Sequence, residues 1–349
     1  MLKINIFFSA LLIFTALFVF EACIESKYKN IPDVSGIDIS LKINRFDQEL
    51  FAIDTNEIES GIQLLEEKYP DFTDFYLQRV LQLKKPWDTI GAYRTYVNGF
   101  LTYPFVRDLH QKVDSVYNQF GDVVQELEQG FQFYKYYFPE KEVPDFFTFI
   151  SEFTYGIVIP PRGNVMAIGL DFFLGKDYPY YYYPPLSLPK YVGRTQDKAH
   201  LPVKVFKGII EDLVGPVPGN RFIDHIIHNG KKLYILDQLL PYHADSLKLQ
   251  YTNSQVEWCK TNELEIWAYI LKEEMMYSDD HQSFKSLVSM APKSAGMPDE
   301  SPGEVGNWMG LQIVSAYMNR MPQLSLQELI SITEPQEILV KSKYKPSRF

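Results

Sequence analysis

Two histidines and an aspartate lie close together in the run Asp224-His225-Ile226-Ile227-His228. In a helix, residues four apart project from the same face, so Asp224 and His228 could both contact one metal ion. Zinc peptidases use this spacing with two histidines, and a glutamate after the first one removes a proton from the metal-bound water. Here Asp224 stands in place of the first histidine and His225 in place of the glutamate. The run keeps a ligand spacing but lacks the usual general base.

A third ligand would have to come from elsewhere, and Glu263 or Glu265 in a later helical stretch offers a carboxylate. General-base catalysis contributes on the order of 100- to 10,000-fold to a rate, so a hydrolase without its carboxylate base would be severely impaired. We favour a structural polar network, which implies no catalytic residue and no cofactor. The alternatives are a metal site without catalysis and a working hydrolase. The network would comprise Asp224, His225, His228, Glu263 and Glu265, and the metal site Asp224, His228 and Glu263.

Other catalytic and nucleotide-binding signatures are absent from the sequence. It has no Gly-x-Ser-x-Gly nucleophile motif, and Pro216 and Pro218 remove amide donors from the stretch where a phosphate loop could lie. A formal net charge of -10 with scattered lysines argues against a nucleic acid partner. Cys259, between Trp258 and Lys260, is typical of a buried, inert thiol. We expect neither nucleotide nor nucleic acid binding.

The first residues predict export and attachment to a membrane. Lys3 precedes the apolar run Ile4–Phe20, which is at the short limit for spanning a bilayer, and Ala22-Cys23 follows. This arrangement resembles the site where lipoprotein signal peptidase cleaves before a cysteine. We therefore predict a signal peptide over residues 1–22 and attachment to membrane lipid through fatty acyl chains, such as palmitate, on Cys23. The alternative is an uncleaved anchor helix.

The rest of the chain predicts a single domain of the α+β class, mostly helical with a small β-sheet. Residues 23–36 are polar and would form a tether, and residues 37–349 would form the domain. Its first part, to about residue 145, has apolar residues at helical spacing.

From about residue 146 the pattern changes to short strands and long helices. The strands are expected at 153–160 and 164–171 as a pair, with further ones at 37–43 and, at the sheet edge, 337–340. An ordered tyrosine-rich loop is expected at 178–185. The helices are expected at 220–241, with an interruption at Asn229-Gly230, at 255 to about 276, and after Gly303.

Five unusual strings carry a resemblance to a known family over nearly the whole chain. They are Asn44–Phe51, Asp171–Tyr178, Asn229–Tyr234, Tyr251–Cys259 with Asn262-Glu263, and Ser301–Gly310. These strings are similar to the gliding-motility lipoprotein GldB family of Bacteroidetes. The resemblance implies an envelope lipoprotein, facing the periplasm or the cell surface, that is required for gliding and associated with the type IX secretion machinery. Its partners would be membrane lipid and other gliding or secretion proteins of the envelope.

The second half, about residues 146–349, is also similar, more remotely, to a family of proposed zinc peptidases. The likeness lies in the helix placement, the Asn262-Glu263 region and the turn Pro-Gly-x-x-Gly-x-Trp that ends at Trp308. It implies a zincin-like scaffold in which the altered Asp224–His228 run no longer supports the reaction. We therefore favour a non-catalytic protein that acts by protein contacts. The alternative is a divergent metal-binding hydrolase that acts on envelope peptides.

Overall fold

The structure is a computed structural model that describes residues 31–85 and 92–347. Contacts group Asp38–Phe349 into one compact unit, separate from the preceding part of the chain. This unit is mostly helical with one small sheet, which confirms the predicted α+β class. The predicted signal peptide and Cys23 lie outside the described residues, and none of the helices that are described is long and apolar enough to cross a membrane.

A four-stranded sheet forms the centre of the compact unit, in the order β1-β2-β4-β3. β2 is parallel to β1 and β4, with Phe147 opposite Ala167, and β3 is antiparallel to β4. The predicted strand pair is therefore confirmed, whereas β2 was not predicted. The strands are β1 (Ile43–Asn44), β2 (Asp145–Phe149), β3 (Ile157–Val158) and β4 (Val165–Gly169).

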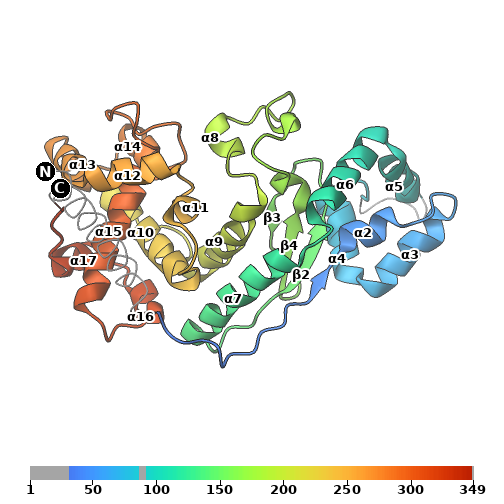
Figure 1. Ribbon diagram of the computed structural model, residues 1–349, viewed down its shortest axis with the longest axis horizontal. Coiled ribbons are helices and arrows are strands. Elements are labelled where there is room, and N and C mark those ends of the chain that lie inside the picture. The colour runs from blue at the N-terminus through green and yellow to red at the C-terminus, as the bar shows by residue number, and fades with distance from the viewer. Residues whose placement is uncertain (1–30, 86–91, 348–349) are drawn as a thin grey trace, which may run out of the picture. The chain divides into compact units, whose positions relative to one another are not determined.

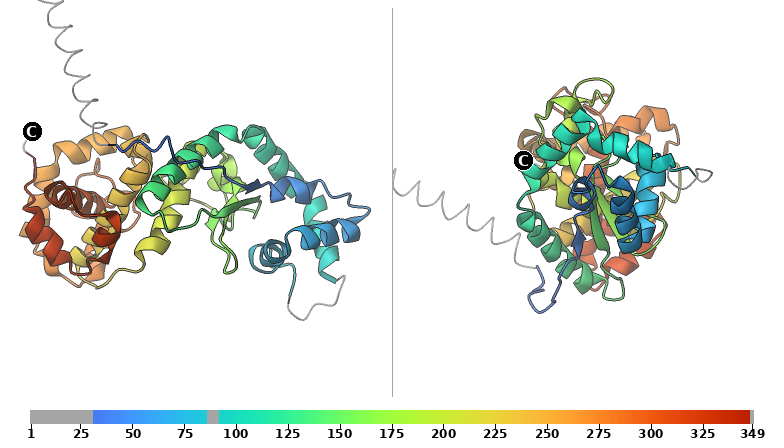
Figure 2. Two further views of the ribbon diagram at one scale, coloured as in Figure 1. Left: turned by 90° about the horizontal axis from the view of Figure 1, so that it is seen from below. Right: turned by 90° about the vertical axis from the view of Figure 1, so that its right-hand side faces the viewer.

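Helices pack on both faces of this sheet because neighbouring residues of β2 point in opposite directions. Phe146 contacts Phe131 of α7, which also lies 4.9 Å from Phe206 of α9, whereas Phe147 stacks on Phe72 of α4 at 4.1 Å. Figures 1 and 2 show the helices that precede α7 gathered on one side of the sheet, whereas α7 (Gly121–Tyr137) lies on the other. The gathered helices are α2 (Phe46–Phe51), α3 (Ile58–Lys68), α4 (Pro70–Phe75), the π-helical turn Tyr76–Val80, α5 (Ala92–Thr102) and α6 (Pro104–Tyr117).

The C-terminal helices form a second group, in which α10 lies against α15 (Figure 1). Glycine permits this close approach: a Cβ atom on Gly310 of α15 would lie 1.8 Å from the carbonyl oxygen of Ile226, and one on Gly230 of α10 would lie 2.4 Å from the carbonyl carbon of Gly310. The helices are α8 (Lys190–Gly193), α9 (Leu201–Val214), α10 (Phe222–Leu239), α11 (Asp245–Leu249), α12 (Asn253–Thr261), α13 (Glu263–Lys272), α14 (His281–Val288), α15 (Val305–Arg320), α16 (Leu326–Ser331) and α17 (Pro335–Ser342).

Three predicted elements are wrong in detail. The predicted edge strand at 337–340 is part of α17, because Pro335 suits the first turn of a helix and the Glu334 carboxylate caps it. The long helix predicted from 255 is divided at Asn262, whose amide group donates to the Trp258 carbonyl and ends α12. Conversely, α10 continues through Asn229-Gly230 because Gly230 serves helix packing.

Two other expectations are met in part. The side chains of Ile37, Ile39, Leu41 and Ile43 are half-buried with exposed residues between them, but only Ile43–Asn44 pairs as a strand. The tyrosine-rich loop is ordered and contains a 3-10 turn over Pro179–Tyr181.

Candidate functional site

Asp224 lies in the first turn of α10. Its carboxylate accepts hydrogen bonds from the Arg221 backbone at 2.8 Å and from the Arg221 guanidinium at 2.8 and 3.1 Å. Burial alone would raise the pKa of Asp224, but these hydrogen bonds from Arg221 bring it below its usual value. Both carboxylate oxygens are thus occupied by donors of Arg221, and Asp224 caps the Arg221 backbone amide at the start of α10. The sequence pattern pointed to Asp224 as a ligand, but its partner is an arginine three residues earlier.

His228 lies one turn further along α10 and is kept neutral. Burial, together with the positive charges of Lys232 and Lys231, lowers its pKa to about 4. Its Nε2 atom is buried without a hydrogen-bond partner among the described residues. A neutral imidazole can bind a metal, so His228 is the one member of the predicted set with a free ligand atom.

Glu263, at the start of α13, binds the C-terminal segment of the chain. Its two carboxylate oxygens accept hydrogen bonds from the hydroxyl groups of Tyr344 and Ser347. Glu265 is exposed, and His225 packs 5.5 Å from His281 and 5.6 Å from Phe284, measured between ring centroids. These side chains therefore belong to separate local clusters.

The predicted donor set does not fit a metal ion. Asp224 is committed to Arg221, and Glu263 to Tyr344 and Ser347, so neither predicted carboxylate is available to a metal on His228. Within the ranges that the structure describes, no group of three or more His, Cys, Asp or Glu side chains is arranged to hold a metal. Asp224 and Glu263 instead each stabilise a local part of the fold.

A cavity of about 240 Å³ lies where α9, α10 and the start of α15 meet. Two opposite charges line it: Lys207 from α9 and Glu304, which precedes α15. Burial lowers the pKa of Lys207, although the charges of Glu304 and Glu211 oppose this effect, and burial raises the pKa of Glu304. The cavity therefore presents both a cation and a carboxylate that are partly withdrawn from water.

Amide side chains fix one wall of this cavity. Asn229 donates to the Asn307 side-chain oxygen at 2.8 Å, and Asn307 donates to the Glu304 carboxylate and to the Val288 carbonyl, each at 3.1 Å. The Tyr251 hydroxyl donates to the Gly303 carbonyl at 2.7 Å. This network holds the backbone before α15 and orients Glu304.

The family model described as gliding motility protein GldB matches residues 27–346. The chain belongs to the GldB family. No curated protein and no solved structure matches it. Membership of the GldB family gives the protein a role in gliding motility.

Three of the strings that carry the GldB resemblance meet at the cavity. Asn229–Tyr234 contributes Asn229 and Lys232, Tyr251–Cys259 contributes its first residue, and Ser301–Gly310 contributes Glu304, Asn307 and Trp308. The glycines of the last string lie in close contact with neighbouring backbone, and the sequence analysis gave its polar residues no role. Lys207 lies outside all five strings, so no local signal indicated it.

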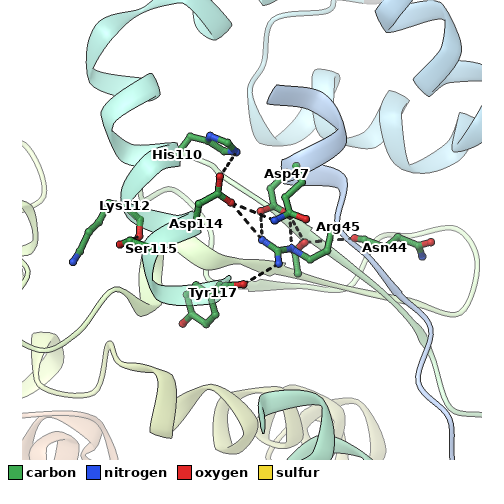
Figure 3. Close-up of polar contacts among 10 residues, drawn as sticks. Asn44, Arg45, Asp47, His110, Lys112, Asp114, Ser115 and Tyr117 are labelled. Carbon is green, nitrogen blue, oxygen red and sulfur yellow. Dashed lines mark hydrogen bonds and ion pairs between the residues drawn. The ribbon is translucent and has the colours of Figure 1, made fainter. Parts of the chain in front are cut away.

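A fourth GldB-like string, Asn44–Phe51, forms a different polar cluster (Figure 3). The Arg45 guanidinium donates to both carboxylate oxygens of Asp47, at 3.0 and 2.8 Å, and to the Tyr117 carbonyl at 3.1 Å. Asp47 is 1% exposed and also accepts a hydrogen bond from the Thr148 hydroxyl of β2. The Asp114 carboxylate lies 3.9 Å from the Arg45 guanidinium. Here each buried charge has its partners within the protein.

Cys259 is fully buried in α12, and burial raises its pKa to about 12. The predicted burial is confirmed, and the raised pKa disfavours the nucleophilic thiolate near neutral pH.

Proposed function

We propose that the protein is a lipid-anchored component of the gliding apparatus in the cell envelope, associated with type IX secretion, and that it acts by protein contacts rather than catalysis. The observation that carries this proposal is the GldB match over residues 27–346, which begins shortly after Cys23. The leader before Cys23 has the features of a lipoprotein signal, and acylation would hold the domain at a membrane, facing the periplasm or the cell surface.

The geometry of the Asp224–His228 region supports a role without catalysis. A zincin-type reaction needs a metal-bound water and a carboxylate base, whereas Asp224 and Glu263 are committed to other protein groups. The remote likeness to zinc peptidases remains a prediction about the scaffold. It does not provide an assembled ligand set for the alternative, a hydrolase of envelope peptides.

The tyrosine-rich loop is a suitable contact surface for an envelope partner. Tyr181 anchors this loop in the core, because its hydroxyl donates to the Asp171 carbonyl at 2.8 Å and accepts from the Leu174 amide at 2.9 Å. Tyr180 and Tyr183 are 47% and 63% exposed. Rigidly held, exposed tyrosines are favoured at protein interfaces because they combine a large contact area with a hydrogen-bonding group.

The anchor is tested by replacing its cysteine. We expect Cys23→Ala to abolish incorporation of labelled palmitate and spreading of cells on a surface. Intact-mass measurement of the wild-type protein should show cleavage before residue 23 and added acyl chains. A mature wild-type protein that begins at residue 1 or carries an unmodified Cys23 would contradict the proposed anchor.

The contact surface is tested with Tyr180→Ala/Tyr183→Ala. We expect reduced spreading at normal protein abundance, because the exposed rings are removed while the Tyr181 anchor is kept. Tyr96→Ala, which removes a ring 58% exposed on α5, is the matched control and should spread normally. Normal spreading of the double variant would exclude this loop as the contact surface.

A further inference from the structure

The cavity beside α15 contains opposite charges that do not pair with each other. Lys207 and Glu304 both line it, yet no ion pair within 4.0 Å joins them, and Lys207 has no hydrogen bond to any described residue. Charged groups in a protein interior are ordinarily paired, because burying an isolated charge is costly. The arrangement leaves room between the two charges for a bound group.

Glu304, which lines the cavity, has an unusual backbone conformation. It adopts a left-handed conformation with φ of 61°, and its amide donates to the Ser286 carbonyl at 2.9 Å. Asn307 donates to only one of its carboxylate oxygens, Oε1. Such strained positions of residues other than glycine are frequent at ligand sites. The second oxygen remains available as a hydrogen-bond acceptor.

Charges of both signs line the cavity, and they argue against a simple cation or anion as the ligand. Lys207 and Lys232 would repel a cation, and Glu304 and Glu211 would repel an anion. Lys232 and Glu211 already form an ion pair with each other, so the charges left to a ligand are one cation and one carboxylate. A group that carries both signs satisfies these two charges together.

Five aliphatic side chains line the cavity beside its charged, amide and aromatic residues. A carbohydrate ligand would ordinarily need an exposed aromatic face, but Trp308 is 3% exposed and Tyr251 is 8% exposed. The volume corresponds to about eight water molecules at roughly 30 Å³ each, which suits a small molecule rather than a chain segment. The aliphatic lining consists of Ile210, Leu233, Leu236, Leu249 and Val288.

We propose that this cavity binds a small zwitterion of the α-amino acid type, with its carboxylate on Lys207, its ammonium on Glu304 and an apolar side chain against the aliphatic wall. This inference goes beyond the proposed function and does not depend on the lipid anchor or on the tyrosine-rich loop.

Isothermal titration of the mature full-length protein with leucine tests the proposal. We expect saturable binding of L-leucine, and binding at least about tenfold weaker for N-acetyl-L-leucine, which lacks the ammonium, and for L-leucinamide, which lacks the carboxylate. D-leucine is included because free amino acids of either hand could be the source of the ligand. Absence of saturable binding for both leucine enantiomers, or binding of either analogue as tight as that of L-leucine, would overturn the proposal.

Two variants assign the charges. We expect Lys207→Met to weaken leucine binding at least about tenfold and to remove the preference over L-leucinamide, and Glu304→Gln to remove the preference over N-acetyl-L-leucine. Exposed residues elsewhere supply matched controls, Lys190→Met and Glu257→Gln, which should bind as the wild type does. Unchanged leucine affinity in both cavity variants, with melting temperatures like that of the wild type, would also overturn the proposal.

Discussion

Two polar clusters in this protein differ in how their charged side chains are paired. In the Arg45 cluster, a guanidinium and a carboxylate form a bidentate pair at 2.8 and 3.0 Å, and backbone and hydroxyl groups complete the set (Figure 3). In the cavity beside α15, Lys207 and Glu304 face the same space and remain apart. Both clusters contain residues from GldB-like strings, so family resemblance alone does not separate a structural role from a binding role.

The difference lies in which charges the fold satisfies. A pair that is complete within the protein, such as Arg45–Asp47, has little left to offer a ligand, and its loss should damage the fold. Charges that are not paired within the protein, such as those of Lys207 and Glu304, cost stability unless a bound ligand pairs with them. We therefore assign Arg45–Asp47 to structure and the cavity to function.

Asp47→Ala should have the largest effect. It leaves Arg45, whose side chain is 18% exposed, without its main partner, so we expect the free energy of unfolding to fall by roughly 3–5 kcal/mol. Urea denaturation measures this change. The double variant Arg45→Met/Asp47→Leu should lose clearly less than Asp47→Ala, since no unpaired charge remains. A loss under 1 kcal/mol for Asp47→Ala, on the scale of about 0–1 kcal/mol expected for exposed pairs, would refute the structural assignment.

Gly310→Ala should have the next largest effect, and it examines the packing of α15 against α10. The added methyl group would lie 1.8 Å from the Ile226 carbonyl oxygen and would force α15 away from α10. We expect a loss of about 1–3 kcal/mol or more in thermal or urea unfolding. Gly121→Ala, at an open position in α7, is the control and should not destabilise. Equal stability of the two variants would contradict the close packing of α10 and α15.

Asp224→Ala should cost about 1–2 kcal/mol, because it removes the cap of α10 and its link to Arg221. Asp224→Asn should recover part of this loss by retaining an acceptor. Circular dichroism during thermal unfolding measures both. If both variants unfold as the wild type does but cells no longer spread, Asp224 belongs to a functional site and not to a structural network.

Lys207→Met should change stability least, or even raise it, because it removes a half-buried cation that has no hydrogen-bond or ion-pair partner among the described residues. The pKa of Lys207 is lower in the folded protein than in the unfolded chain, so the unfolded chain binds more protons between these two values. The free energy of unfolding of the wild type should therefore rise as the pH increases through this interval. That of Lys207→Met should rise less. Urea unfolding at a series of alkaline pH values measures the difference. A stability loss as large as that of Asp47→Ala would erase the distinction between the two clusters.

The sequence predicted the class of the fold and several elements because local patterns were sufficient. A helix was expected after Gly303, and α15 begins at Val305. The strand pair β3–β4 followed from β-branched runs around a turn, whereas β2 has the sequence Asp-Phe-Phe-Thr-Phe and no simple alternation, since both of its faces are covered.

The polar sites were harder to predict than the helices and strands. The hydrogen-bond partners of their side chains lie either far away in the sequence or only a few residues away. Asp224 is satisfied by Arg221, three residues earlier, and Glu263 by Tyr344 and Ser347 near the end of the chain. Lys207 and Glu304 line the same cavity because α9 and α15 both pack against α10. Residue spacing along one helix contains no information on such pairings.

Surface spreading of cells that carry Lys207→Met/Glu304→Gln in place of the wild-type chain tests the central assignment most directly. We expect spreading to be lost while the protein remains at wild-type abundance and melts at the wild-type temperature, because the cavity is needed for function and not for folding. Normal spreading by cells that contain this variant at wild-type abundance would contradict the assignment.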